Sequence, residues 1–250
     1  MIGALAERSA LYAILIIPRS GSTWFCEIIG KAGGLGKPQE WFNLDFVRGE
    51  AMHLDCKPPK LRGTRDINRY VSEIVEEGNG AAGVQLSYWQ AQSLVELSGG
   101  WLPVGKIKWF YLRRKDILSQ AISLYKSAAT GYWHSYQGSS NRLGNLSFDP
   151  ERCTGRLAEL IAAEIKFEEM FASCGISPCR LLYEDIQIDP LGSLQSFAAA
   201  IGRDVPKSLP GTELRLLRNS QTDSWRHELE ASYRVAEILS ARPGIATNSA

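Results

Sequence analysis

The sequence has few of the residues that cross-link or metallate small domains. Its 250 residues include only five cysteines and three histidines, which are widely scattered, and the odd cysteine count follows no regular spacing. Secreted disulfide scaffolds and structural zinc sites use closely spaced cysteines or Cys–His sets. We therefore expect no disulfide framework and no metal site, and this cysteine usage predicts a cytoplasmic protein.

Long apolar segments are also absent, since no run approaches the roughly 20 residues that cross a bilayer. The apolar run 11–17 follows Glu7, ends at Pro18 and has no small-residue cleavage site nearby, so it does not resemble a signal peptide. Charge is balanced, with 28 Lys and Arg against 27 Asp and Glu, which argues against a nucleic-acid binder. With 44% hydrophobic residues, the chain predicts one folded domain over 1–240 and a flexible tail at 241–250.

Apolar strands alternate with amphipathic helices along the chain. Helices follow each predicted strand, and a Gly/Ser/Asn-rich stretch at 135–145 indicates a mobile loop or lid. Strands that alternate with helices indicate right-handed crossovers, so we predict an α/β fold with a mostly parallel central sheet flanked by helices. The predicted strands are 11–17, 84–88, 107–112 and 180–186. The predicted helices include one at about 66–77, one that Gly131 ends, 150–173 with Asp149 as its cap, one that begins at Asp189-Pro190, and 224–240.

A short polar loop, PRSGST (18–23), joins the first predicted strand to the first helix. Gly21 permits a tight turn, and the amides of Ser20 to Thr23 lie at a helix start, where unpaired N–H groups bind phosphate or sulfate. Ser22 and Thr23 add hydroxyl groups, and Arg19 adds a permanent charge. An ordinary turn with Ser22 as the helix cap is an open alternative. The loop lacks the Lys and upstream Gly of a nucleoside-triphosphate loop, so it favours an anion bound without a metal.

A second basic segment, YLRRKDILSQAIS (111–123), follows the third predicted strand. Arg114 leaves the strand, and Ser119 and Ser123 are four residues apart on one helix face. Arginine and serine around one point make a phosphate clamp. The open alternative is that the charges at 113–115 only solvate the strand end.

A carboxylate, Glu40, lies in GKPQEWF (36–42), 17 residues after Thr23. One helix and one turn return the chain to the sheet edge that carries the anion loop. A carboxylate beside an anion site has a task there if it deprotonates an attacking hydroxyl. A helix first-turn Glu, stabilised by the helix dipole, is the alternative. Trp41, Phe42, Tyr132 and Trp133 lie next to these segments in the sequence, and such rings suit a sugar face, with His134 as a further hydrogen-bonding group.

Together, PRSGSTWFCEIIGKAGGLGKPQEWF and YLRRKDILSQAISLYKSAATGYW resemble the bacterial trehalose 2-sulfotransferase family, whose donor is 3′-phosphoadenosine 5′-phosphosulfate (PAPS). The order and separation of the two blocks match over most of the chain. The resemblance implies a P-loop-like sulfotransferase fold, transfer to a carbohydrate or glycolipid hydroxyl, and a homodimer. It also implies roles for individual residues. Arg19, Ser20, Gly21, Ser22 and Thr23 would hold the 5′-phosphosulfate, with Arg19 also catalytic; Arg114 and Ser123, with Ser119, would hold the 3′-phosphate; Arg218 and Trp225 would line the nucleotide; Glu40 would be the base; Trp41, Phe42, Trp133 and His134 would bind the acceptor.

One segment departs from the family. In GVQLSYWQ (83–90), Gln85 occupies a position where family members often have Lys. The missing charge then comes from elsewhere, such as Lys106 or Arg113, or the acceptor site differs. Two other functions remain open, namely a non-catalytic nucleotide- or anion-binding protein of this fold and a metal-dependent kinase.

Overall fold

The structure, a computed structural model, describes residues 10–43, 74, 80–97, 104–133, 146–212 and 220–244. Within these ranges the sheet has the strand order β2-β1-β3-β4, and every pairing is parallel, which confirms the predicted sheet type. The order changes direction between β1 and β3, because β2 and β3 lie on opposite sides of β1. Open α/β sheets bind ligands at such a switch point, beyond the carboxyl ends of the strands. The strands are β1 (Ala10–Ile16), β2 (Ala81–Leu86), β3 (Lys108–Arg113) and β4 (Cys179–Leu182).

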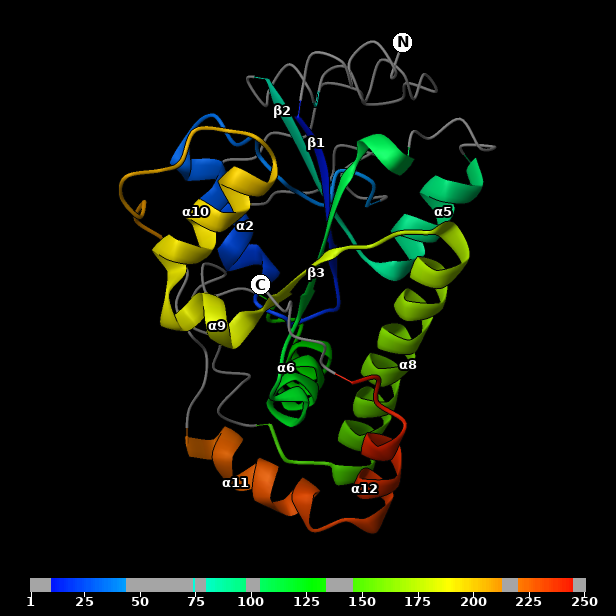
Figure 1. Ribbon diagram of the computed structural model, residues 1–250. Coiled ribbons are helices and arrows are strands. Elements are labelled where there is room, and N and C mark those ends of the chain that lie inside the picture. The colour runs from blue at the N-terminus through cyan, green and yellow to red at the C-terminus, as the bar shows by residue number, and fades with distance from the viewer. Residues whose placement is uncertain are drawn as a thin grey trace.

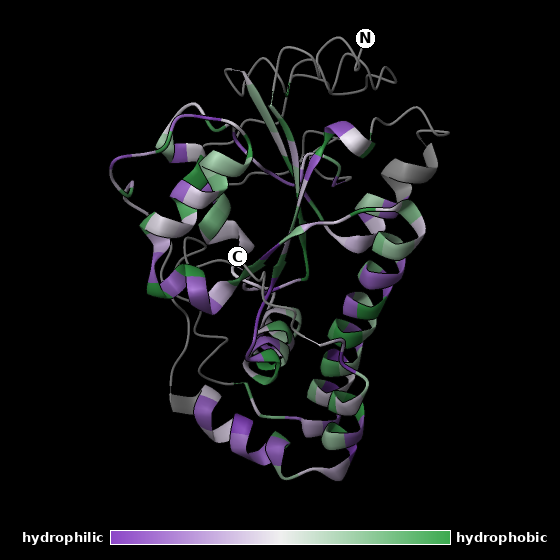
Figure 2. Cartoon of the chain, viewed as in Figure 1, coloured by the Kyte–Doolittle hydropathy of each residue, from purple (hydrophilic) through white to green (hydrophobic). Residues whose placement is uncertain are grey.

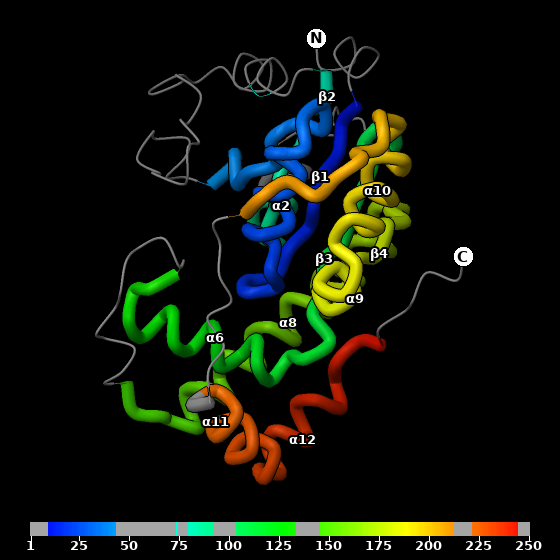
Figure 3. The backbone as a smooth tube through the Cα atoms, turned by 90° about the vertical axis from the view of Figure 1, so that its left-hand side faces the viewer, coloured from blue at the N-terminus to red at the C-terminus, as the bar shows by residue number. Residues whose placement is uncertain are grey.

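Helices cover both faces of the sheet (Figure 1). One face packs against α2 (Ser22–Ala32), α9 (Tyr183–Ile188) and α10 (Pro190–Ala200), and the other faces α5 (Tyr88–Leu97) and α8 (Pro150–Cys174). Beyond the carboxyl ends of the strands lies α6 (Ile117–Thr130), with α11 (Ser220–Glu230) and α12 (Tyr233–Ser240) below it, as the turned view also shows (Figure 3). A short 3-10 turn, Val104–Lys106, precedes β3.

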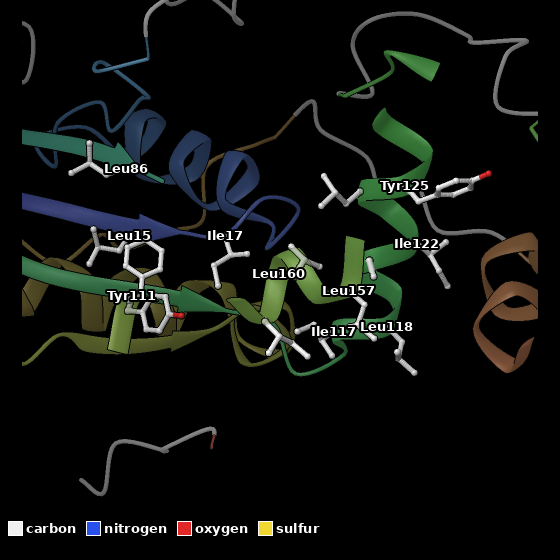
Figure 4. Close-up of a cluster of buried hydrophobic side chains, with 14 of the residues drawn as sticks. Leu15, Ile17, Leu86, Tyr111, Ile117, Leu118, Ile122, Tyr125, Leu157 and Leu160 are labelled. Atoms are coloured by element: carbon white, nitrogen blue, oxygen red, sulfur yellow. The ribbon is translucent and has the colours of Figure 1, made fainter. Parts of the chain in front are cut away.

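Strand β1 has apolar side chains on both faces, which explains its continuous hydrophobic sequence. Successive side chains alternate between the two helical layers. Tyr12, Ile14 and Ile16 belong to the core shared with α2 and α10. Leu15 and Ile17 belong to the core shared with α6 and α8, and Figure 4 shows them beside Leu86, Tyr111, Leu157 and Leu160.

The helix boundaries follow the capping residues seen in the sequence. Asp149 accepts a hydrogen bond from the Arg152 amide (3.0 Å) at the start of α8, and Asp189 accepts one from Gly192 (2.8 Å) at the start of α10. Gly131, in the left-handed region, ends α6. Hydrophilic and hydrophobic bands alternate along α8, as expected of a helix with one buried stripe (Figure 2).

Two predicted element boundaries are wrong. The segment 180–186 was expected to be one strand, but β4 ends at Leu182 and the chain turns into α9 at Tyr183. Tyr183 and Ile186 are buried one helical turn apart, and Glu184 and Asp185 lie in the first turn, where acidic residues favour a helix. The segment 224–240 was expected to be one helix, but α11 ends at Glu230 and a second helix, α12, begins at Tyr233. The helix predicted around 66–77 lies outside the described residues, except for Ile74.

Residues 241–244, which begin the segment expected to be a tail, contact the fold. Arg242 donates hydrogen bonds to both carboxylate oxygens of Glu164 at 2.9 Å, and Glu164 is only 1% exposed. A buried ion pair fixes this segment against α8. In the part of the chain that the structure describes, no helix is long and apolar enough to cross a membrane.

Candidate active site

The loop after β1 turns sharply into α2. Arg19 and Gly21 both have positive φ angles, 65° and 83°, and the Ser20 amide donates to the Ile17 carbonyl at 3.2 Å. Gly21 is the residue that precedes α2, and no side chain caps the helix start. Ser22, the alternative cap, is instead the first helical residue. The first amides of α2 therefore lack a side-chain acceptor and are suited to an anion.

The loop side chains add donors to these amides. Ser20 is completely buried, and within the described residues its hydroxyl has no hydrogen-bond partner. A buried hydroxyl left without a partner costs about 1–3 kcal/mol. Ser22 is also buried, and Thr23 is half-buried. An oxyanion at the turn would supply the acceptor that Ser20 lacks, so the loop fits the phosphosulfate end of PAPS.

Arg19 joins the loop to α6. Its Nε donates to the Ser123 hydroxyl at 2.9 Å, and its Nη1 donates to the carbonyl of Trp133. Burial, followed by the neighbouring Arg114 guanidinium, lowers the pKa of Arg19. No carboxylate of the described residues forms an ion pair with Arg19. A partly buried cation without a counter-charge favours an anionic ligand.

Arg114 lies beside Arg19, so the two predicted basic segments are neighbours in space. Its Nη1 is 3.4 Å from the Arg19 carbonyl oxygen, and its guanidinium lies 5.1 Å from the centre of the Tyr183 ring. Ser123 contacts Arg19, and Ser119 is buried one helical turn earlier on the same face of α6. The structure thus gathers Arg19, Arg114, Ser119 and Ser123 near the switch point between β1 and β3.

Tyr183 and Glu184 support this arrangement and were not identified from the sequence. The Glu184 carboxylate accepts hydrogen bonds from the amides of Lys115 (2.9 Å) and Asp116 (3.1 Å), and it lies 3.9 Å from Arg114 Nε. It therefore holds the turn between β3 and α6. The acidic pair Glu184-Asp185 after an apolar run indicates a helix start, but the predicted strand 180–186 contains both residues.

The Glu40 carboxylate is surrounded by side-chain amides. Gln85 Nε2 donates to Glu40 Oε1 (3.2 Å), and Asn43 Nδ2 and Gln90 Nε2 lie 3.1 and 3.4 Å from Oε2. We call Asn43, Gln85 and Gln90 the amide cage. A carboxylate offers about four acceptor directions, so the cage leaves room for one further donor. In the described part of the chain no cation contacts Glu40.

The amide cage is itself fixed by the fold. Gln90 Oε1 accepts from the Ser87 amide (2.8 Å) at the start of α5, which is half of a capping box and turns the NH₂ group of Gln90 toward Glu40. Gln85 is 4% exposed, and its backbone N–H donates a hydrogen bond to the Gln39 backbone carbonyl at 2.8 Å. The sequence SYWQ at 87–90 carries the capping signal, whereas nothing local links Gln85 to Glu40.

Register places Glu40 at the ligand-binding edge of the sheet. Gln39 pairs with Val84, so Glu40 lies near the carboxyl end of β2, next to the strand that leads into the anion loop. Burial, followed by the charge of Glu40, raises the pKa of Cys26, a residue in the second turn of α2. Glu40 thus lies close to the helix whose start forms the anion loop, and Cys26 remains a neutral thiol.

The amide cage predicts a defined kinetic effect. Replacing Gln85 with Leu removes one donor from Glu40; if Glu40 is the base that the sequence predicts, we expect kcat to fall about tenfold, as for loss of a partner that orients a functional group. The KM for the donor should not change, because Gln85 does not contact Arg19 or Arg114. Steady-state kinetics of Gln85→Leu and of the exposed control Gln187→Leu test this; a change in donor KM with unaltered kcat contradicts it.

The expected acceptor residues differ in exposure. Trp41 is 1% exposed, and its indole N–H lies 3.1 Å from the Lys37 carbonyl and 3.2 Å from that of Gly83. This packing corrects the expectation of a sugar-facing ring, because a buried indole has no free face. Phe42 is half-buried against the core beside α6 and α8, and Trp133 is 39% exposed. His134, Arg218 and the loop 135–145 lie outside the described residues.

Two other expectations are corrected by packing. Arg113 cannot supply charge at the Gln85 position, because it is 2% exposed and pairs with Glu164. Trp225 is buried and stacks on Phe148, with ring centres 4.8 Å apart, so its ring forms part of the core. The described residues contain no cluster of three His, Cys, Asp or Glu side chains that would hold a metal ion.

Comparison with known proteins identifies the family. The model of the Stf0 sulphotransferase family matches residues 11–101 and 102–234. Trehalose 2-sulfotransferase from Mycobacterium tuberculosis (strain ATCC 35801 / TMC 107 / Erdman) is 26% identical over 266 residues, covering 88% of this chain and 95% of that protein. A crystal structure of a sulfotransferase from Alicyclobacillus acidocaldarius has a TM-score of 0.48 at 13% identity, covering 92% of this chain and 96% of that one. Sulfotransferase STF9 from Mycobacterium avium has a TM-score of 0.46 at 8% identity, covering 92% and 70%. Because the family model spans most of its length, the chain belongs to the Stf0 sulphotransferase family.

Proposed function

We propose that this protein transfers a sulfuryl group from PAPS to a hydroxyl group of a carbohydrate or glycolipid, with Glu40 as the general base. The observation that carries the proposal is the guanidinium of Arg19, which lies between the uncapped start of α2 and α6 with no carboxylate of the described residues paired to it. Family membership and the trehalose 2-sulfotransferase relative support the reaction type and a sugar acceptor.

The residues gathered at the sheet edge supply the parts that such a transfer needs. PAPS brings an activated sulfuryl group. The α2 amides, Ser20 and Arg19 bind its phosphosulfate end, and Arg114, with Ser123 and Ser119, binds the 3′-phosphate. This assignment gives the two anionic ends of the donor two cationic contacts, which follow different strands and are adjacent in space.

The proposed reaction is an in-line displacement at sulfur. The acceptor oxygen forms the new S–O bond, the bond from sulfur to the bridging phosphate oxygen breaks, and the acceptor proton moves to Glu40. The amide cage holds Glu40 in place for that proton, and Arg19 stabilises the charge that develops on the departing phosphate. Positioning and charge stabilisation by preorganised groups account for most of the catalysis in such transfers.

Ligand binding tests the donor assignment before any acceptor is known. At a PAP concentration of about 100 times Kd, binding stabilises the protein by about 2.7 kcal/mol, so the thermal midpoint should rise by about 5 °C or more. ATP with Mg²⁺ should give little shift, because the loop lacks the Lys of a nucleoside-triphosphate site. Arg19→Gln should abolish the PAP shift, and the control Arg156→Gln, a half-buried arginine of α8 far along the chain from the loop, should keep it. A shift with ATP–Mg²⁺ and none with PAP would instead support a metal-dependent kinase.

Transfer itself is tested with radiolabelled PAPS and a panel of glycans that includes trehalose, with mass spectrometry of the products. A labelled sugar sulfate supports the proposal. PAP binding without transfer to any acceptor favours the other candidate, a nucleotide-binding protein of the same fold. The dimer and the cytoplasmic location remain predictions from the sequence.

A further inference from the structure

The four residues after α12 are bound to β3 and to the turn that follows it. We call residues 241–244 the C-terminal strap. Arg242 Nη2 donates to the Arg114 carbonyl at 2.5 Å, and its Nη1 donates to the Lys115 carbonyl at 2.9 Å. In return, Arg113 donates to the carbonyls of Pro243 and Gly244, both at 2.9 Å. The contacts are therefore reciprocal.

A single carboxylate joins the two arginines of this arrangement. Glu164 of α8 accepts from Arg113 and, through both oxygens, from Arg242. Glu164 and Arg113 are almost completely buried, and the Arg242 side chain is 12% exposed. Buried charges hold their geometry tightly, because separating them leaves a desolvated ion without a partner. The strap is consequently a rigid support.

The strap supports the turn between β3 and α6, and this turn carries Arg114. Glu184 fixes the amides of Lys115 and Asp116 on one side of the turn, and Arg242 fixes the carbonyls of Arg114 and Lys115 on the other. With both sides held, the Arg114 guanidinium is directed to the Arg19 carbonyl and the Tyr183 ring. Cationic groups placed before the ligand arrives bind it without a further ordering cost.

We infer that Arg242 is a positioning residue of the donor site, which sets the place of Arg114 through the backbone of the β3–α6 turn. The inference rests on the proposed role of Arg114 toward the 3′-phosphate. Arg242 itself is not expected to touch the donor, since its donor groups are directed to Glu164 and to the two carbonyls.

The test compares PAP with adenosine 5′-monophosphate, which lacks the 3′-phosphate, by calorimetry. In Arg242→Gln we expect affinity for PAP to fall by roughly tenfold, the scale for loss of an orienting partner, and affinity for adenosine 5′-monophosphate to stay unchanged. The control Arg234→Gln alters an exposed arginine of α12 and should bind both ligands as the wild type does. Equal loss for both ligands, or no loss for PAP, overturns the inference.

Two further measurements keep the test decisive if Arg242→Gln does not fold. Arg242→Lys retains the charge facing Glu164 but not the planar fork that reaches two carbonyls, and it should show the same selective loss of PAP affinity. In the wild type, PAP should slow hydrogen exchange at the strap amides, because coupling between sites is reciprocal. Wild-type affinity in Arg242→Lys, or unchanged exchange, overturns the inference. Failure of the wild type to bind PAP at all contradicts the proposed function instead.

Discussion

Replacing Glu40 with Gln lowers turnover by about 10²–10⁴-fold, the range over which a general base contributes. The side chain keeps its size but loses the ability to accept a proton. One amide of the cage also loses its acceptor, because the new NH₂ group faces another donor. Affinity for PAP should persist, since neither Arg19 nor Arg114 contacts Glu40.

Single-turnover kinetics together with calorimetry separate these two outcomes. The control is Glu228→Gln, which makes the same chemical change at an exposed position of α11 and should leave both quantities unchanged. Undiminished turnover in Glu40→Gln removes Glu40 from the mechanism. Loss of PAP binding in that variant would show that the change disturbs the anion loop.

Replacing Gly21 with Ala should lower the affinity for PAP by about 100-fold, or about 2.7 kcal/mol. A Cβ on Gly21 would lie 2.2 and 2.3 Å from two carbons of the Tyr183 ring, and φ is +83°. The ring must therefore move, and Arg114 loses the surface on which it rests. The turn that presents the α2 amides is displaced as well.

Gly175→Ala is a matched control, because Gly175 shares the left-handed backbone conformation of Gly21 without the collision. Gly175 follows α8 with φ of +63° and ψ of 31°, and no atom lies within 4 Å of an added Cβ. Both variants should lose about 1–2 kcal/mol of stability from the left-handed backbone, measured by denaturant unfolding. Only Gly21→Ala should lose PAP affinity. Equal affinities in the two variants would show that the Gly21–Tyr183 contact is unimportant for the donor site.

The parts of the fold and site that the sequence predicts are those with local signals. The continuous apolar run of β1, the Asp caps of α8 and α10, and the glycine at the end of α6 each act within a few residues. Local signals likewise single out the loop at 18–23 and the segment from Arg114 to Ser123 as candidate anion-binding segments. Parallel strands then bring both segments to one sheet edge, which makes their proximity in space predictable.

The parts that the sequence does not predict depend on contacts between distant residues. Gln85 meets Glu40 across 45 positions, and no periodicity or spacing connects them. The segment 180–186 has an apolar start typical of a strand, but burial of Tyr183 and Ile186 against other elements favours a helix from Tyr183 onward. Trp41 belongs to the same class, because its indole is satisfied by the carbonyl of Gly83, 42 residues later.

The strap has a consequence for how the chain reaches its native state during synthesis. Arg113 and Pro243 are 130 residues apart, so the backbone acceptors of the buried charge at the end of β3 leave the ribosome long after the strand itself. Until then, the nascent chain holds an arginine whose backbone acceptors do not yet exist. We therefore expect the β3 region to consolidate late in synthesis, and a chain that stops before Pro243 would leave Arg113 paired with Glu164 but without these two carbonyl acceptors.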